Sequence, residues 1–142
     1  MIYPYDKLIT EKRVLCEECA LARVGLINYN AGHLQLMTND SSFDKFSMCY
    51  ITYYYYENID YEKYVIPSAD NPNILVPTKE RAIIEYMKNE KWCDEGVLIE
   101  ALKNYLRWFR NDEELYKVAD HFEVKRDLVD YWINEALTDE DM

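Results

Sequence analysis

Two cysteines near the start of the chain, Cys16 and Cys19, have the spacing of a metal-binding or redox pair. A structural zinc site would add a second close pair of ligands, and the other cysteines and histidines are scattered. Thiol–disulfide exchange needs an electropositive setting that lowers the thiol pKa, whereas Glu17 and Glu18 stand between these sulfurs. We therefore expect free thiols that pack as small apolar helix residues, with no metal and no cofactor. Zinc binding and redox activity are the two alternatives.

Adjacent carboxylates are the other groups that could do acid–base chemistry. They include the pairs at residues 17–18, 94–95 and 113–114. General acid–base catalysis requires carboxylates that converge in a cleft, and sequence neighbours in so acidic a chain are usually solvated. The sequence contains no GxSxG, no HExxH and no glycine-rich phosphate loop. It therefore predicts that the protein is not an enzyme.

The 142-residue chain carries a formal net charge of −11, from 27 acidic and 16 basic side chains. Such a field repels phosphate backbones and attracts basic proteins, so the composition favours a protein partner over nucleic acid. No apolar run approaches the roughly 20 residues that span a bilayer, and the first seven residues lack the pattern of a signal peptide. We expect a cytoplasmic protein that does not enter a membrane.

The elements that would position these residues meet at a strand-to-helix junction. Pro77 disfavours helix at the residue before it, which favours an extended approach. Thr78 suits a helix N-cap, and Glu80 complements the helix dipole. We interpret Pro77, Thr78, Glu80 and Arg81 as a structural hinge.

The hinge divides a predicted α+β fold into two parts that pack as a single domain. Residues 1–77 are expected to hold one leading helix and a small, mostly antiparallel sheet, and residues 78–142 a C-terminal helical bundle. The leading helix is predicted from Val14 to Leu26, closed by Gly25. Strands are predicted at residues 33–38, 46–56, 63–67 and 74–76. The later helices are predicted to begin at Thr78, near Asp94, at Asn111 or Asp112, and near Lys125.

Tyrosines crowd the longest predicted strand, Phe46–Tyr56. Aromatic and β-branched residues favour strands, and tyrosines on both faces indicate that one face is not strictly buried. An exposed surface of this kind is adhesive unless another element or a partner covers it. We predict that Tyr53 and Tyr55 contact a partner protein. The alternative is an ordinary core strand.

A second candidate contact lies in the helical part. Lys103, Arg107 and Arg110 are spaced for one side of a helix, and we assign them to partner binding. The alternative is a solvated face whose cations pair with nearby acids.

Residues 115–136 resemble a helix-turn-helix unit, in which two helices pack across a tight turn. The DNA contacts of such a unit would be Lys125 and Arg126, although neighbouring carboxylates would also face the phosphates. Glu123 stands in the turn where glycine is usual. A DNA-binding transcriptional regulator is therefore the alternative function.

Three segments carry a family resemblance. The segment Cys19–Leu26 is similar to a short helix of the type "small residue–Ala-Leu … Gly-Leu", and residues 33–36 and 49–52 form a similar strand pair. The most specific segment, Val76–Tyr86, resembles a strand-to-helix motif Pro-Ser/Thr-x-Glu-Arg-Ala followed by helices. In this order the segments resemble the C-terminal domain of AbiEi-type antitoxins, from type IV abortive-infection toxin–antitoxin systems.

The resemblance implies a protein-interaction module that binds and neutralises a nucleotidyltransferase-like toxin. It also implies that Arg81 pairs with a carboxylate across the hinge and holds the sheet to the bundle. Family members usually carry an N-terminal winged helix that represses their own promoter, for which the residues before Val14 leave no room. We expect a shortened antitoxin, a partner-binding module or a fragment.

Overall fold

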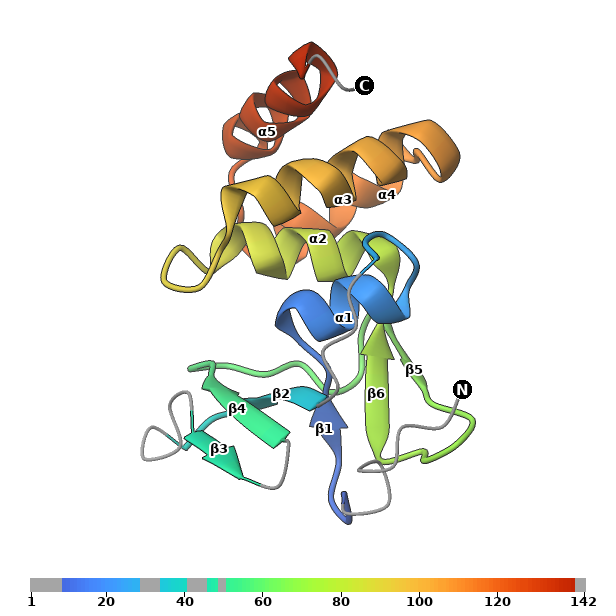
Figure 1. Ribbon diagram of the computed structural model, residues 1–142, viewed down its shortest axis with the longest axis vertical. Coiled ribbons are helices and arrows are strands. Elements are labelled where there is room, and N and C mark those ends of the chain that lie inside the picture. Colours follow the sequence, from blue (N-terminus) through green and yellow to red (C-terminus); the bar gives the residue numbers. More distant parts are fainter. Residues whose placement is uncertain (1–8, 29–33, 41–45, 49–50, 140–142) are drawn as a thin grey trace.

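The computed structural model describes residues 9–28, 34–40, 46–48 and 51–139. The chain is an α+β fold, with strands in its first part and helices in its second (Figure 1). In chain order the first part contains β1 (Arg13–Val14), α1 (Glu17–Arg23), β2 (Leu34–Thr38), β3 (Phe46–Met48), β4 (Ile51–Tyr55), β5 (Val65–Pro67) and β6 (Ile74–Pro77). The helices that follow are α2 (Lys79–Lys88), α3 (Glu95–Trp108), α4 (Asp112–His121) and α5 (Arg126–Thr138).

The strands form two small mixed sheets, which corrects the prediction of one mostly antiparallel sheet. The strand orders are β1-β6-β5 and β2-β4-β3, and each sheet combines one parallel and one antiparallel pair. An isolated bridge between Leu15 and Leu36 joins the sheets. The predicted start of the leading helix at Val14 is also wrong, because Val14 pairs with Leu75 in β1 and β6. The helix begins at Glu17 and ends before Gly25, whose φ of 82° is the left-handed conformation of a C-terminal cap.

The single long strand predicted over Phe46–Tyr56 is a hairpin. Strands β3 and β4 are antiparallel, with Met48 opposite Ile51. Cys49 and the residue after it lie outside the described residues. Strand propensity is equally high on both sides of the reversal, and the sequence there lacks the Asn-Gly or Asp-Gly signal of a tight turn, so propensity alone could not locate it.

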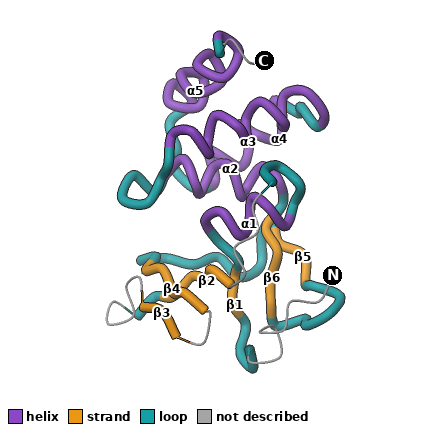
Figure 2. The backbone as a smooth tube through the Cα atoms, in the orientation of Figure 1, coloured by secondary structure: helices purple, strands orange, loops and turns teal. Residues whose placement is uncertain are grey.

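Strand β6 ends at Pro77 and is followed at once by α2, which lies at the centre of the molecule (Figure 1). The Thr78 hydroxyl accepts a hydrogen bond from the Arg81 backbone N–H at 3.3 Å, which caps α2. Helix α2 is buried from Arg81 to Met87 and contacts α1, α3 and α4. Figure 2 shows both sheets at one end and α5 at the other, with α1 and α2 between them. One hydrophobic cluster includes side chains from the sheets and from all five helices.

The remaining helices follow their apolar periodicity. The side chains of Asp94 and Asn111 cap α3 and α4 as expected. The buried faces contain Leu98, Ala101, Leu102 and Tyr105 on α3, Leu115, Val118 and Ala119 on α4, and Val129, Ile133 and Ala136 on α5. None of the helices in the described ranges has the length and apolar character that crossing a bilayer requires.

The turn between α4 and α5 has the geometry of a glycine turn without the glycine. Glu123 adopts φ of 60°, while the backbone N–H of Val124 donates to the Ala119 carbonyl at 2.8 Å. We predict that Glu123→Gly raises the free energy of unfolding by about 1 kcal/mol, because glycine adopts positive φ without a Cβ penalty. Urea unfolding measures this change. Glu135→Gly, inside α5, is the control and should destabilise by about 0.5–1 kcal/mol; equal destabilisation by both variants would contradict the prediction.

Candidate functional site

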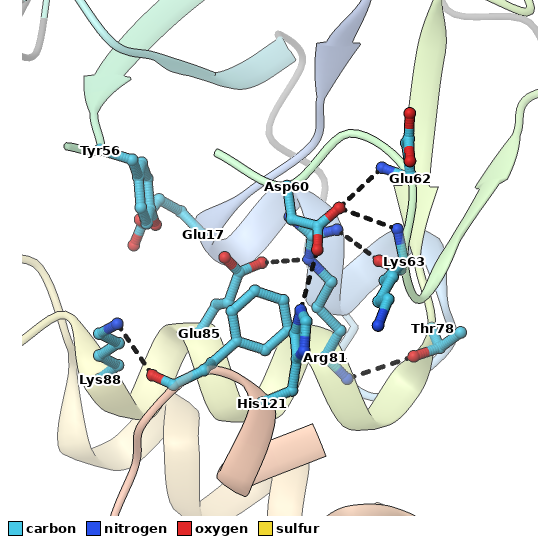
Figure 3. A network of polar contacts seen from close by, with 11 residues as sticks. Glu17, Tyr56, Asp60, Glu62, Lys63, Thr78, Arg81, Glu85, Lys88 and His121 are labelled. Carbon is cyan, nitrogen blue, oxygen red and sulfur yellow. Dashed lines mark hydrogen bonds and ion pairs between the residues drawn. The ribbon is translucent and has the colours of Figure 1, made fainter. Parts of the chain in front are cut away.

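A polar junction joins the sheet part to the helices, and the fully buried Arg81 is its centre (Figure 3). Its Nε donates to Glu85 Oε1 at 2.7 Å, and its Nη1 donates to the Lys63 carbonyl at 2.7 Å. The guanidinium carbon lies 4.9 Å from the centre of the Phe122 ring. Arg81 thus connects the loop before β5, helix α2 and the end of α4.

This geometry corrects the role that the resemblance implied for Arg81. Its carboxylate partner, Glu85, lies one turn along the same helix. The contact that crosses the hinge goes to a backbone carbonyl, because the loop at Lys63 presents its main chain to α2. Burial raises the pKa of Glu85 and the positive charge of Arg81 opposes that rise. The hinge residue Glu80 instead accepts a hydrogen bond from the Tyr105 hydroxyl at 2.8 Å, which ties α2 to α3.

A second link crosses the same junction. His121 Nε2, at the end of α4, lies 2.8 Å from Asp60 Oδ2. Asp60 Oδ1 accepts hydrogen bonds from the backbone N–H groups of Glu62 and Lys63. Partial burial raises the pKa of Asp60, but these backbone hydrogen bonds and His121 outweigh it and lower the pKa to about 2. Asp60 is therefore a carboxylate at neutral pH and holds the loop against α4.

A cavity of about 550 Å³ opens beside this histidine–aspartate pair. Its lining is Asn58, Ile59, Asp60, Tyr61, Glu62, Lys88, His121, Phe122 and Glu123. An acyl-transfer site would need a serine, threonine or cysteine nucleophile next to the histidine, and this lining provides none. The Nζ of Lys88 donates to the Phe122 carbonyl at 2.9 Å. The polar side chains at this junction therefore serve to connect elements of the fold.

Glu17 is another buried acid near this junction, and the expectation that it is solvated is wrong. Its side chain is 3% exposed, and its backbone φ of 54° is left-handed. Oε1 accepts hydrogen bonds from the Tyr56 hydroxyl and from Asn89 Nδ2, while Oε2 is buried without a partner among the described residues. Burial raises the pKa of Glu17 to about 7; the Tyr56 hydrogen bond opposes this, and the charges of Glu18 and Glu85 add to it. Two adjacent glutamates in a sequence give no indication that one of them will be buried.

The neighbouring Glu18 belongs to a separate network that fixes α1 to the sheet. Its two oxygens accept hydrogen bonds from Tyr86 and from Gln35 Nε2. The same Gln35 nitrogen lies 2.8 Å from the Tyr54 hydroxyl, and Gln35 Oε1 accepts from the Cys19 N–H at 2.7 Å. Both polar atoms of the Gln35 side chain therefore have protein partners, which allows its burial inside β2.

Cys16 and Cys19 are both buried. Burial raises the pKa of Cys16 well above its ordinary value, and the charge of Glu17 raises it further. Thiolates are the nucleophiles and metal ligands of proteins, so this setting disfavours both chemistries. The described part of the chain contains no group of three or more His, Cys, Asp or Glu side chains that could hold a metal ion.

The predicted contact tyrosines lie on β4, the central strand of its sheet. Tyr53 and Tyr55 are half-buried. Tyr54 is buried on the other face, where its ring packs edge-on against Trp92 with centroids 4.9 Å apart. The Tyr56 hydroxyl is committed to the Glu17 carboxylate. The tyrosine run is therefore divided between structural roles and partly exposed surface.

The predicted basic helix edge is largely neutralised. Lys103 forms an ion pair with Asp139, and Arg110 Nε lies 2.9 Å from Asp112. Arg107 is exposed in the last turn of α3. Pairing of two of these cations with acids is what the solvated-face alternative predicted. Figure 1 places β4 and α3 in different parts of the molecule, so the predicted contact residues do not form one patch.

The predicted DNA contacts are also close to acids. Arg126 Nη2 lies 2.7 Å from Asp120, and its guanidinium stacks on the Tyr116 ring at 5.1 Å. Lys125 is exposed at the N-cap of α5. A carboxylate that holds Arg126 competes with a phosphate for the same donors.

Sequence reasoning missed the exposed aromatic side chains on the helices. Trp108 is 69% exposed, Phe109 42% and Tyr131 53%, and Leu137 is also exposed. They were overlooked because helical periodicity identifies the buried face of a helix and does not show which large side chains elsewhere stay uncovered. Helix ends and outer faces leave them uncovered here. The sequence matches no protein-family model and no curated protein.

Proposed function

We propose that the chain is an antitoxin-like protein-interaction module that binds and neutralises a partner protein. The observation that carries this proposal is the set of large aromatic side chains left exposed on α3 and α5, above all Trp108 and Tyr131. Exposed aromatic rings of this size commonly mark protein–protein contacts, because they supply large contact areas at little entropic cost. The net charge of −11 favours a partner with a basic surface.

The partner class follows from the resemblance of Val76–Tyr86 and its flanking segments to AbiEi-type antitoxins. The proposed partner is a nucleotidyltransferase-like toxin, which the chain would bind in the cytoplasm as part of an abortive-infection system. The candidate contacts are Tyr53, Tyr55, Lys103, Arg107 and Arg110. Of these, Arg107 is exposed and, among the described residues, has no ion pair like those of Lys103 and Arg110, and Tyr55 lines a cavity beside Lys88, so these two are the best places to test.

Purification of the tagged chain from its own cells tests the proposal. We expect a basic, nucleotidyltransferase-like protein to co-purify in stoichiometric amount, identified by mass spectrometry. At least one of Tyr55→Ala and Arg107→Glu should lower its retention about tenfold, because contact aromatics and cations carry much of an interface's energy. The control, Lys117→Glu, reverses an exposed charge on α4 and should leave retention unchanged.

Two results would contradict the proposal. One is recovery of the folded chain alone. The other is recovery of nucleic acid that moderate salt releases and that Arg126→Glu abolishes, which would favour the helix-turn-helix regulator built on α4 and α5.

A further inference from the structure

A groove of about 560 Å³ runs between α3 and α5, away from the polar junction. Its lining is Glu95, Gly96, Ile99, Glu100, Lys103, Tyr131, Trp132, Glu135 and Asp139. Aromatic and acidic side chains therefore share one concave surface. The Arg81 and His121 contacts of the polar junction lie outside this surface.

The floor of the groove is aromatic. The rings of Tyr131 and Trp132 meet edge to face, with centroids 5.1 Å apart and an interplanar angle of 79°. Trp132 is partly buried against the core, so it holds the more exposed Tyr131 in place. Ile99 adds an aliphatic contact from α3. The π faces of such rings attract cations, and their area accepts apolar side chains.

The rim of the groove is acidic. Lys103 is its one cation, and that charge is paired with Asp139. Glu100 accepts a hydrogen bond from the backbone N–H of Asn28 at 3.3 Å. Among the described residues neither Glu95 nor Glu135 has a cationic partner. The groove therefore keeps a negative potential over an aromatic floor.

We propose that this groove binds a basic amphipathic segment of a partner protein. A lysine or arginine of that segment lies over Tyr131 between the carboxylates of Glu95 and Glu135, and an apolar side chain rests on Ile99. Charge complementarity selects this occupant, because the same carboxylates repel nucleic acid and anionic lipid headgroups. The inference rests on the proposed function and assigns it a surface and a partner chemistry.

A peptide titration of the whole chain tests this groove. The probe is a short synthetic peptide that repeats Arg-Leu-Leu-Lys, and its counterpart replaces both cations with glutamate. We expect the basic peptide to shift the backbone amide NMR signals of α3 and α5 around the groove, and to bind more weakly as salt rises. The acidic peptide should leave those signals unchanged.

Matched variants locate the contact. Tyr131→Ala and Glu135→Lys should each weaken binding of the basic peptide about three- to fivefold. Ile66→Ala removes an apolar side chain that is 63% exposed on β5, and Glu90→Lys makes the same charge change outside the groove. Both controls should leave the affinity unchanged. Equal weakening by Glu135→Lys and Glu90→Lys would mean that net charge alone attracts the peptide, which overturns the inference.

The outcomes separate this inference from the proposed function. If the partner co-purifies with the chain and Tyr131→Ala and Glu135→Lys do not affect its retention, the groove assignment fails and the antitoxin-like function stands. If the basic peptide shifts only signals from β3, β4 or the polar junction, or none at all, the groove assignment fails as well. If the groove binds the peptide as expected but no protein partner exists in cells, the proposed function fails.

Discussion

Arg81→Met is expected to lower the free energy of unfolding by about 3–5 kcal/mol, because it leaves the buried Glu85 without its partner. The variant also removes the donor to the Lys63 carbonyl and the cation over the Phe122 ring. Methionine fills much of the space of the arginine stem, so the loss reflects the missing charge and hydrogen bonds. Urea or thermal unfolding at neutral pH measures it.

The control is the double variant Arg81→Met/Glu85→Leu. Removal of both charges eliminates the uncompensated carboxylate, so the double variant should recover most of the stability lost by Arg81→Met. A double variant as unstable as the single one would contradict the account. The hydrogen bond that crosses the hinge to Lys63, rather than the ion pair within α2, would then carry the stability of the junction.

Glu17→Gln is expected to stabilise the protein at pH 8 and to flatten its stability between pH 5 and pH 8. The pKa of Glu17 is raised from 4.5 to about 7, so the folded state binds a proton in this window that the unfolded state has released. Stability from this group is therefore full below pH 4.5 and is lost as pH rises through about 7. Between pH 5 and pH 8 this loss amounts to about 2–3 kcal/mol by linkage. Because glutamine cannot ionise, the Glu17→Gln variant should not lose this stability as the pH rises.

Urea unfolding at pH 5 and pH 8 tests the Glu17 prediction. The wild type should be less stable at pH 8 than the Glu17→Gln variant, and the two should converge near pH 5. Glu57→Gln, which neutralises an exposed acid two residues from the end of β4, is the control and should keep the wild-type slope. If the Glu17→Gln variant keeps the wild-type dependence of stability on pH, the prediction is contradicted, because ionisation of Glu17 would then not destabilise the folded protein.

The helices could be predicted from the sequence because helix caps and helical periodicity depend on residues close together in the chain. Thr78, Asp94 and Asn111 cap their helices through contacts three residues away, and the buried residues repeat at helical spacing. The sheets were harder to predict because each strand pairs with residues that are distant in the sequence. The two residues of β1 form a strand only because residues some sixty positions later lie beside them.

The candidate site could be predicted only in outline. Arg81 and the hinge were found from the Pro-Thr-x-Glu-Arg pattern, but its partner on Lys63 depends on a loop without regular structure. Glu17 sits among four other acidic and polar groups, which come from α1, from α2 and its C-cap, and from the residue after β4, and no pattern within the sequence brings them together. The groove between α3 and α5 was missed because it forms between two helices that are apart in the sequence, and the periodicity of each helix does not show how the two pack.

A growth assay tests the central claim, that this chain neutralises a partner protein. The partner captured with the tagged chain is expressed alone, and then together with the chain, in a host that lacks both genes. We predict that the partner alone arrests growth, that co-expression of the chain restores it, and that the variant that lowers retention in the purification restores it less. An arrest that persists in the presence of the folded, bound chain would contradict the claim.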